Sequence, residues 1–283
     1  MPDEFVHLNG AFVRPAEAKV SVLDRGFTFA DGVYEVIRIV AGRGFRLDDH
    51  RARLERGCAA LEIQANADEW ASVMLETARR NGVREGTVYL QVTRGAATRQ
   101  HAFPGGTRPT VVAWTRPFPG RGPEEWDAGV SCITLPDERH GLCEIKTTSL
   151  LPNVLANEKA HRAGAYEAVL VRDGVVTEGS HASVLAVFDG VVWTHPIRNI
   201  LPGVTRALAL AAARDLGIPV REEGVPIGRL READEIFLTG TTTEVLGVVR
   251  LDGAPVGGGK VGPVTRKLYE AYRAEVDRVR RSG

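Results

Sequence analysis

Residues 166–194 read YEAVLVRDGVVTEGSHASVLAVFDGVVWT, a stretch of short β-branched and aromatic runs separated by turns. The dipeptides Asp173-Gly174 and Asp189-Gly190 tolerate the positive φ angles that tight hairpin turns require. The stretch therefore predicts consecutive strands. We expect them at residues 166–171, 175–177, 184–188 and 191–194, which makes the C-terminal half of the chain rich in sheet.

Further helical and strand patterns surround this stretch. Apolar residues at helical spacing predict helices at residues 152–163, 205–216 and 262–279, the last of them amphipathic. Runs of β-forming residues predict strands at residues 130–135, 144–147 and 236–239.

The N-terminal half begins with a hairpin pattern, in which Asn9-Gly10 separates two short apolar runs within residues 5–13. Further strands are expected at residues 33–40, 45–47, 88–93 and 110–115. Asp48 or Asp49 can cap a helix that runs through residue 61. A second helix is expected to begin at Asp68 and to end at Gly82, with one face formed by Trp70, Val73, Met74 and Thr77.

Residues 117–123 read PFPGRGP and suit neither a helix nor a central strand, because proline lacks a backbone donor and glycine adds an entropic cost. We interpret this segment as an interdomain linker. The expected domains are an α/β domain at residues 1–116 and a sheet-rich domain at residues 124–283. A single elongated domain is also compatible with a chain of 283 residues.

Charge and composition exclude several classes of partner. Lys plus Arg and Asp plus Glu both total 36, so no net field favours nucleic acid or an anionic membrane. No stretch approaches the ~20 apolar residues of a membrane span. The cysteines Cys58, Cys132 and Cys143 lack metal-ligand spacing, so no metal site is expected. Since no apolar signal core follows Met1, we expect a cytoplasmic protein whose partners are small molecules.

Lysine is scarce, because only five of the 36 cationic residues are lysine. Lys146 lies in Cys143-Glu144-Ile145-Lys146-Thr147-Thr148, a strand-like run in which an amine can point inward. Partial desolvation lowers the pKa of an amine and makes it a nucleophile. The alternative is a solvated lysine on a strand, which is the commoner situation.

Two segments have the chemistry of a phosphate cradle. In residues 201–206, LPGVTR, a glycine turn leads into a helix whose free N–H groups and dipole attract an anion. In residues 237–244, FLTGTTTE, a strand ends at a glycine followed by hydroxyls that can form a similar nest. Either turn can instead simply cap a helix or end a strand. Glu178, between a strand and Gly179, can present a carboxylate to a pyridine nitrogen or remain a solvated turn residue.

Taken together, the chain resembles the class IV transaminases, pyridoxal-phosphate enzymes of fold type IV, nearly from end to end. Six segments occur in that family's order: residues 24–36 (DRGFTFADGVYEV), 50–54 (HRARL), 144–146 (EIK), 177–180 (TEGS), 201–206 (LPGVTR) and 239–244 (TGTTTE). The resemblance implies an α/β (α+β) fold of two domains, an N-terminal α/β domain and a sheet-rich pseudo-barrel domain that binds pyridoxal 5'-phosphate. It also implies a homodimer.

The resemblance also assigns residues to the cofactor. Lys146 corresponds to the catalytic Schiff-base lysine, Glu178 to the ligand of the pyridine nitrogen, and Arg53 to a phosphate ligand. The remaining positions that match the family's cofactor site are Val204, Thr205, Thr241 and Thr242, at the phosphate, and Leu201, on the ring face.

Residues 92–104, VTRGAATRQHAFP, resemble the segment of D-amino acid transaminases in which an Arg-x-His pair and a tyrosine hold the substrate carboxylate. The pair corresponds to Arg99 and His101, and the tyrosine to Tyr34. A guanidinium binds a carboxylate through two parallel hydrogen bonds, and a phenol adds a directional donor. In the implied homodimer this loop reaches the neighbouring subunit's active site. The alternative is a mobile surface loop.

We therefore expect a transaminase that moves an amino group between a D-amino acid, such as D-alanine or D-glutamate, and a 2-oxo acid. Alternatives within the family are an L-branched-chain transaminase, an (R)-amine transaminase and an aminodeoxychorismate lyase. Outside it, the alternative is a non-enzymatic protein that binds a phosphate ligand. One departure affects substrate scope: the family commonly follows the glutamate with a polar run ending in asparagine, whereas this chain has Ser180-His181-Ala182-Ser183.

Overall fold

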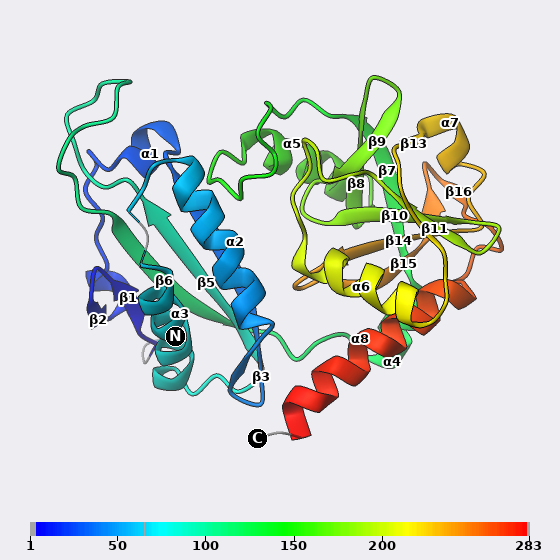
Figure 1. The fold of residues 1–283 in the computed structure, drawn as a ribbon, viewed down its shortest axis with the longest axis horizontal. Helices are drawn as coiled ribbons and strands as arrows, with labels where there is room; N and C mark the ends of the chain where they lie inside the picture. The colour runs from blue at the N-terminus through cyan, green and yellow to red at the C-terminus, as the bar shows by residue number, and fades with distance from the viewer. Residues whose placement is uncertain (1–3, 65, 282–283) are drawn as a thin grey trace. The chain divides into compact units, whose positions relative to one another are not determined.

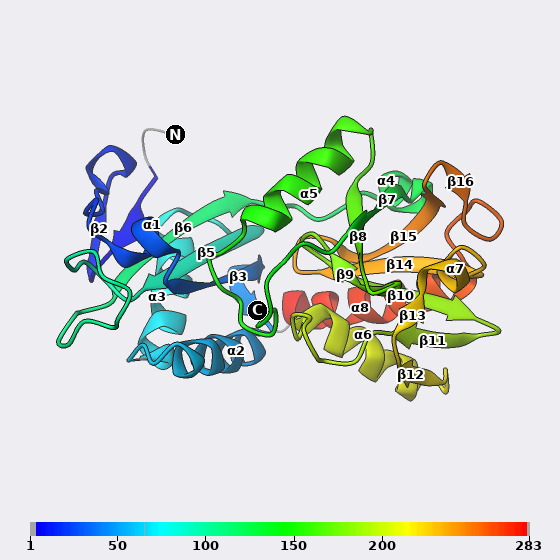
Figure 2. The same ribbon diagram turned by 90° about the horizontal axis from the view of Figure 1, so that it is seen from above.

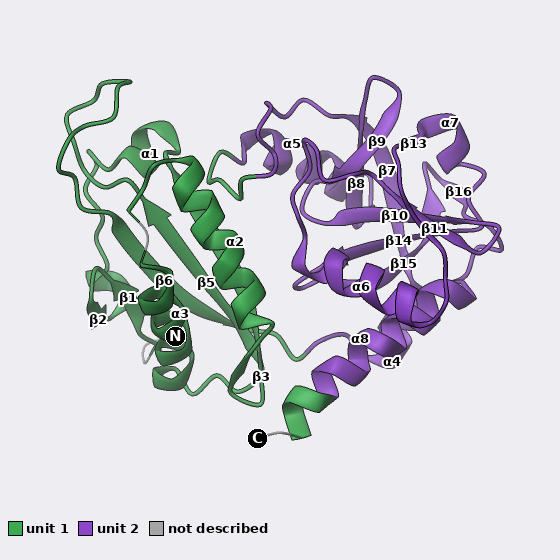
Figure 3. Cartoon of the chain, in the orientation of Figure 1, with its two compact units in different colours: residues 1–119, 145–149, 278–283 green, residues 120–144, 150–277 purple. Residues whose placement is uncertain are grey.

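The computed structural model describes residues 4–64 and 66–281. Contacts within the chain define two compact units, which Figure 3 colours separately. Unit 1 comprises Met1–Pro119, Ile145–Ser149 and Arg278–Gly283, and unit 2 comprises Gly120–Glu144 and Leu150–Asp277. The sequence-based division differs, since it assigns all of residues 124–283 to one domain. The segment around Lys146 joins unit 1 because its backbone hydrogen-bonds to a strand there.

Within the described residues, unit 1 contains a six-stranded antiparallel sheet with the order β2-β1-β6-β5-β3-β4. Its strands are β1 (Val6–Leu8), β2 (Ala11–Val13), β3 (Gly32–Val40), β4 (Arg43–Phe45), β5 (Gly86–Thr93) and β6 (Thr110–Pro117), and the short helices before β3 are η1 (Pro15–Glu17) and α1 (Arg25–Phe29). The expected hairpin at Asn9-Gly10 is confirmed, with φ angles of 50° and 91°.

Two helices, α2 (Leu47–Ala60) and α3 (Ala67–Arg80), cover one face of this sheet (Figures 1 and 2). Their side chains Leu54 and Trp70 form one hydrophobic core with Ile37 of β3. Burying one large apolar side chain stabilises a fold by about 1.5–3 kcal/mol. This core therefore fixes the sheet that carries the candidate site residues of unit 1.

Three local expectations are wrong. The strand expected at residues 45–47 is instead β4 at Arg43–Phe45, and Leu47 already begins α2. Asp48 and Asp49 do not cap α2, because the N-cap is Arg46, and the aspartates instead lie in the first turn, where they interact favourably with the helix dipole. Residues 144–147 form no strand, since this segment is a turn in which one bridge joins Thr147 to Val33.

In the described part of the chain, unit 2 contains a mixed ten-stranded sheet that follows the path β12-β11-β10-β14-β15-β7-β8-β9-β13, with β16 paired to β15. The strands are β7 (Val130–Pro136), β8 (Glu167–Arg172), β9 (Val175–Gly179), β10 (Ser183–Phe188), β11 (Val191–Thr194), β12 (Val220–Glu222), β13 (Val225–Pro226), β14 (Glu235–Gly240), β15 (Glu244–Leu251) and β16 (Ala254–Pro255). The four strands expected within residues 166–194 are confirmed. The sheet is curled, as Figures 1 and 2 show.

The strand β15 has no counterpart among the expected strands. Gly247 interrupts its apolar pattern, and a glycine inside a strand weakens the sequence signal. The structure explains this glycine, because a Cβ at Gly247 would lie 2.9 Å from the side chain of Val261.

The remaining helices are α4 (Pro123–Ala128), α5 (Leu151–Arg162), α6 (Val204–Asp215), α7 (Ile227–Leu230) and α8 (Pro263–Arg281). Those expected at residues 152–163, 205–216 and 262–279 are confirmed. Pro123, the last residue of the expected linker, begins α4, which buries Trp126. Among the helices of residues 4–64 and 66–281, none combines the length and apolarity that a membrane span requires.

Candidate active site

Lys146 lies in a short segment that hydrogen-bonds to the start of β3. The backbone N–H of Tyr34 donates to the Lys146 carbonyl at 3.0 Å, and the N–H of Thr148 donates to the Gly32 carbonyl at 3.1 Å. The Lys146 Nζ lies 3.2 Å from the Tyr34 hydroxyl oxygen and 4.2 Å from the centre of the Tyr34 ring. The fold thus brings together the expected catalytic lysine and the expected substrate tyrosine.

Tyr34 belongs to an aromatic row that crosses three strands of unit 1. Its ring stacks on that of Tyr89 with centroids 5.4 Å apart, and Tyr89 stacks on Trp114 at 4.2 Å. The Tyr89 hydroxyl donates to Gln91 at 2.8 Å, and burial, followed by the proximity of Tyr34, raises the pKa of Tyr89. The row is closely stacked, so it holds the Tyr34 ring in one orientation beside Lys146.

Arg53, on α2, forms a buried ion pair with Glu35 of β3. Its Nε and Nη2 donate to the two Glu35 oxygens at 2.7 and 2.9 Å, and His50 Nδ1 lies 2.8 Å from Glu35 Oε2. Burial acts to raise the pKa of Glu35, but the charge and hydrogen bonds of Arg53, then of His50, hold that pKa well below its usual range. Glu35 therefore stays ionised and fixes the direction of the Arg53 guanidinium.

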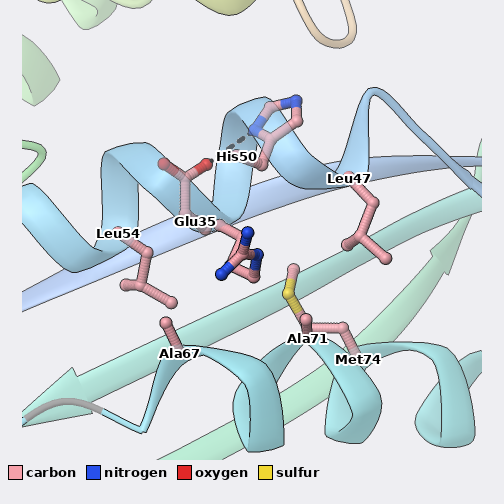
Figure 4. A pocket seen from close by; sticks show the side chains of 8 residues that line it. Glu35, Leu47, His50, Leu54, Ala67, Ala71 and Met74 are labelled. Atoms are coloured by element: carbon pink, nitrogen blue, oxygen red, sulfur yellow. Dashed lines mark hydrogen bonds and ion pairs between the residues drawn. The ribbon is translucent and has the colours of Figure 1, made fainter.

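Figure 4 shows Glu35 and His50 beside a cavity of about 10 Å³ that residues of α2 and α3 also line. This volume is about that of one water position, so the cavity offers no room for a substrate. Tyr34 and Glu35 are successive residues of β3 and project to opposite faces of the strand. Arg53 and Lys146 consequently reach β3 from different sides.

Glu178 lies near the end of β9 in unit 2, and its side chain is 6% exposed. Arg139 donates to its carboxylate, and so does the backbone N–H of Leu201, at 3.1 and 3.2 Å from the two oxygens. Asp137 holds the Arg139 guanidinium through contacts of 2.8 and 2.9 Å. Burial acts to raise the pKa of Asp137, but the hydrogen bonds and charge of Arg139 lower it to about 2.

The sequence analysis missed Arg139 and Asp137. The available signal is that Asp137-Glu138-Arg139 directly follows the strand expected at residues 130–135, and polar residues at strand ends often serve binding sites. An Asp-x-Arg pair on a loop is nevertheless common on protein surfaces. Only the folded sheet places it beside Glu178.

In unit 2 the two expected phosphate segments lie near the connection from β9 to β10, one beside Ser183 at the start of β10 and the other near His181. A Cβ on Gly203, before α6, would lie 2.9 Å from the Ser183 Oγ. A Cβ on Gly240, after β14, would lie 3.8 Å from the His181 carbonyl oxygen and 3.1 Å from the Thr243 Oγ1. The absence of a side chain keeps the Gly203 backbone close to Ser183, and at Gly240 it leaves room for the Thr243 side chain.

The donors around these glycines suit a phosphate group. The N-cap Gly203 provides no side-chain cap for α6, so N–H groups of its first turn, which includes Val204 and Thr205, can bind an anion. Within the described residues, the buried Thr239 Oγ1 has no hydrogen-bond partner. Thr241 and Thr242 add hydroxyls in the following turn. The residues present therefore fit the phosphate end of pyridoxal phosphate, and the buried Glu178 fits its basic nitrogen.

The departure at residues 180–183 also has a structural role. His181 Nδ1 lies 2.8 Å from the carboxylate of Glu167, whose side chain is fully buried, and Ser180 donates to the same carboxylate. Burial acts to raise the pKa of Glu167, but hydrogen bonds from His181, Ser180 and the Ala168 backbone lower it. Glu167 therefore anchors the turn that follows Glu178.

Arg99 and His101 lie on the loop between β5 and β6 in unit 1. The Arg99 guanidinium lies 4.8 Å from the centre of the Phe29 ring, and the His101 ring lies 5.4 Å from it. In the part of the chain that the structure describes, neither side chain has a hydrogen bond to Tyr34. The fold of one chain thus groups Arg99 with His101 on α1 but leaves both apart from Tyr34.

Comparisons with known proteins agree with this geometry. The family Amino-transferase class IV matches residues 32–251. The chain is 41% identical over 278 residues to a D-alanine aminotransferase of Staphylococcus aureus (strain MSSA476), covering 97% of this chain and 98% of that protein. It is 42% identical over 275 residues to the D-alanine aminotransferase of Bacillus licheniformis, covering 96% of each chain.

Solved structures of the same family are also similar. The branched-chain amino acid aminotransferase of Escherichia coli has a TM-score of 0.89 at 27% identity, covering 96% of this chain and 94% of that one. A second branched-chain amino acid aminotransferase, solved with pyridoxamine 5'-phosphate, has a TM-score of 0.89 at 30% identity, covering 97% and 94%. The match over most of the chain and the identity to full-length relatives place this protein in the class IV aminotransferases, enzymes that depend on pyridoxal phosphate.

Proposed function

We propose that this protein transfers an amino group between a D-amino acid, such as D-alanine or D-glutamate, and a 2-oxo acid. The observation that carries the proposal is the loop of Arg99 and His101, two side chains that pack together on Phe29 and present cationic and hydrogen-bonding groups. The names of the D-alanine aminotransferases to which the chain is similar support the same substrate class.

When bound, pyridoxal phosphate supplies an aldehyde that bonds to an amine and a ring that withdraws electrons from the attached carbon. The Lys146 Nζ would hold the aldehyde of the bound cofactor and, when free, would move the proton at the substrate Cα. Tyr34, 3.2 Å from Nζ, orients the lysine for this transfer.

Glu178 would hold the proton on the pyridine nitrogen of the bound cofactor. Its carboxylate is directed by two donors, the Arg139 guanidinium and the Leu201 backbone N–H. A protonated ring withdraws electrons more strongly, so Glu178 acts on the rate of Cα–H cleavage. The Leu201 side chain would pack on the ring face.

The phosphate group would be held at the N-terminus of α6 and by the hydroxyls that follow β14. The proposed phosphate ligands are Val204, Thr205, Thr241, Thr242 and Arg53. Backbone N–H groups at a helix N-terminus bind a phosphate without losing side-chain entropy. Arg53 contributes a guanidinium whose direction Glu35 sets.

In the proposed homodimer, the substrate carboxylate would be held by Tyr34 of one subunit together with Arg99 and His101 of its partner. Assays of D-alanine, D-glutamate and L-leucine against 2-oxoglutarate test this assignment, and we expect turnover of the two D-amino acids and little of L-leucine. Arg99→Ala should lower kcat/KM for D-alanine by about one to two powers of ten, because a charge-assisted bond to a carboxylate contributes about 1.5–3 kcal/mol. The matched control is Arg108→Ala, an exposed arginine of the same loop.

Similarity to branched-chain aminotransferase structures keeps an L-selective enzyme as the second candidate. A wild-type enzyme that prefers L-leucine, together with an Arg99→Ala variant that uses D-alanine as the wild type does, would replace the D-selective assignment with this one.

The proposed assembly is a homodimer. Apolar side chains near α1 and the Arg99 loop are exposed in the single chain, among them Val22 (72%), Phe27 (77%) and Phe103 (52%). Contiguous exposed apolar side chains commonly mark a protein interface. Sedimentation of the wild type should give twice the mass of one chain, and sedimentation of Phe27→Asp should give the mass of a single chain. Leu216→Asp, at an exposed leucine of α6's C-cap, should leave the mass unchanged.

The proposed location is the cytoplasm. Cys58 and Cys132 are buried free thiols, and burial raises the pKa of Cys58 to about 12. Such thiols persist in a reducing compartment. Thiol labelling of the protein purified from its native cells should find all three cysteines reduced once the chain is unfolded.

A further inference from the structure

The loop that carries Arg99 and His101 is fixed to α1 by its backbone. Arg25 of α1 is 3% exposed, and its guanidinium donates to the carbonyl oxygens of Gln100 at 2.6 Å and of His101 at 3.3 Å. These acceptors are main-chain atoms. Arg25 therefore positions the loop backbone directly, whatever side chain residue 100 carries.

A second arginine and one carboxylate lock Arg25 in place. Asp31 accepts from Arg25 Nε at 2.7 Å and from Arg94 Nε at 2.7 Å, and the side chains of both arginines are almost fully buried. Arg94 also donates to the carbonyls of Leu61 and Glu62, at 2.6 and 3.3 Å, just beyond the end of α2. The cluster thus joins the loop to the helix that carries Arg53.

The base of the same loop is closed by backbone contacts. Arg25 N–H donates to the Gly95 carbonyl at 2.9 Å, and Asp24 forms an isolated bridge with Ala96. Gly95 has a φ of +98°, and a Cβ there would lie 2.0 Å from the Arg108 carbonyl oxygen. Phe29, one helical turn after Arg25, supplies the ring on which Arg99 and His101 pack.

We propose that Arg25, held by Asp31 and Arg94, is the positioning residue of the substrate-carboxylate loop and thereby sets the affinity of the enzyme for amino acids. This inference rests on the proposed role of Arg99 and His101. A guanidinium reaches two neighbouring carbonyls at once because its donors form a rigid fork, whereas an ammonium is a compact point charge. Lysine at position 25 would keep the charge next to Asp31 but lose the fork.

The test compares the holoenzyme with Arg25→Lys and with Arg108→Lys, a control in the same loop. In Arg25→Lys, KM for D-alanine should rise by about tenfold while kcat changes by less than about twofold. The reason is that the loop is no longer held in its binding conformation before the substrate binds. Amide hydrogen exchange of residues 99–103, measured without substrate, should accelerate by about tenfold. The absorbance of bound cofactor should not change, and Arg108→Lys should match the wild type in every measurement.

Three results would overturn the inference: an unchanged KM, an unchanged loop exchange rate, or a fall in kcat in place of the rise in KM. If Arg25→Lys does not fold, Phe29→Leu decides, because it removes the ring under Arg99 and His101 and should also raise KM alone. Arg99→Ala separates the positioning role of Arg25 from the carboxylate-binding role of Arg99 and His101. If Arg99→Ala raises KM and Arg25→Lys does not, only the positioning role of Arg25 is contradicted. If Arg99→Ala has no effect, the carboxylate role of the loop fails first.

Discussion

The Nζ of Lys146 lies 3.2 Å from the hydroxyl oxygen of Tyr34 and 4.2 Å from the centre of its ring. These residues are 112 positions apart in the sequence. An ammonium above an aromatic face is attracted by the ring's negative face, and the hydroxyl adds a hydrogen bond. The contact positions the amine on which the proposed chemistry depends.

Lys146→Ala should abolish covalent attachment of pyridoxal phosphate and lower transamination by at least about 10² to 10⁴-fold, the range that a positioned acid–base group contributes. Borohydride reduction of the wild-type holoenzyme followed by peptide mass analysis should find the cofactor on Lys146. Lys159→Ala, at an exposed lysine of α5, is the matched control and should keep full activity. A reduced adduct on Lys159 would rule out the assignment.

Tyr34→Phe removes the hydroxyl beside Lys146 but keeps the ring stacked on Tyr89. We expect kcat/KM for D-alanine to fall by about tenfold, the effect of one lost hydrogen bond of about 1.4 kcal/mol, with an unchanged melting temperature. Tyr89→Phe controls for the aromatic row, because the Tyr89 hydroxyl points to Gln91. Equal losses in the two variants would show that the row, and not the contact to Lys146, matters.

Glu178→Gln keeps the shape of a buried side chain but removes its charge. Cofactor affinity should change little, while single half-reactions measured by rapid mixing should slow by about 10² or more, because the ring nitrogen no longer stays protonated. Glu138→Gln, at an exposed glutamate of the same unit, should react at the wild-type rate. Wild-type rates in Glu178→Gln would remove this residue from the mechanism.

Asp137 should make the stability of the protein depend on pH. The folded-state pKa of Asp137 is about 2, below the usual value of about 3.9. The contribution of Asp137 to the free energy of unfolding is therefore full above about pH 5 and is lost as the pH falls toward 2. The size of the shift corresponds to about 2 to 3 kcal/mol.

Thermal unfolding of wild type and Asp137→Asn between pH 7 and pH 2 measures this contribution. The difference in melting temperature should be largest near neutral pH and should vanish in acid. Asp127→Asn removes an exposed partner of Arg266 and should have almost no effect at any pH. A gap between wild type and Asp137→Asn that stays constant with pH would falsify the prediction.

Local sequence patterns determined most of the secondary structure. The hairpin at Asn9-Gly10 and the strands joined at Asp173-Gly174 and Asp189-Gly190 follow from residues that adopt positive φ at low cost, and the structure has them at these positions. The sequence did not predict the N-cap of α2, because Arg46 adopts a left-handed conformation that no side-chain pattern indicates. The turn at residues 144–147 resembles a strand in composition alone.

The candidate site residues also fall into two groups, those that the sequence predicted and those that only the structure revealed. Motif order along the chain was sufficient to propose Lys146, Glu178 and the segment from Leu201 as site residues, because these segments occur in the order of the family that the chain resembles. The sequence analysis did not find the site residues that lie outside these motifs. Arg139 and Asp137 became visible only when the sheet of unit 2 placed them beside Glu178.

The sequence by itself determined the family and the cofactor and predicted the residues that carry the chemistry, since these depend on which side chains occur and in what order. Tertiary structure alone decided that Asp31 binds two buried arginines, that Arg25 donates to the backbone of the Arg99 loop, and that Arg53 is directed by Glu35. The physical reason is that a buried charge must find a partner in space, and the backbone carbonyls and distant carboxylates that serve as partners carry no local sequence signal.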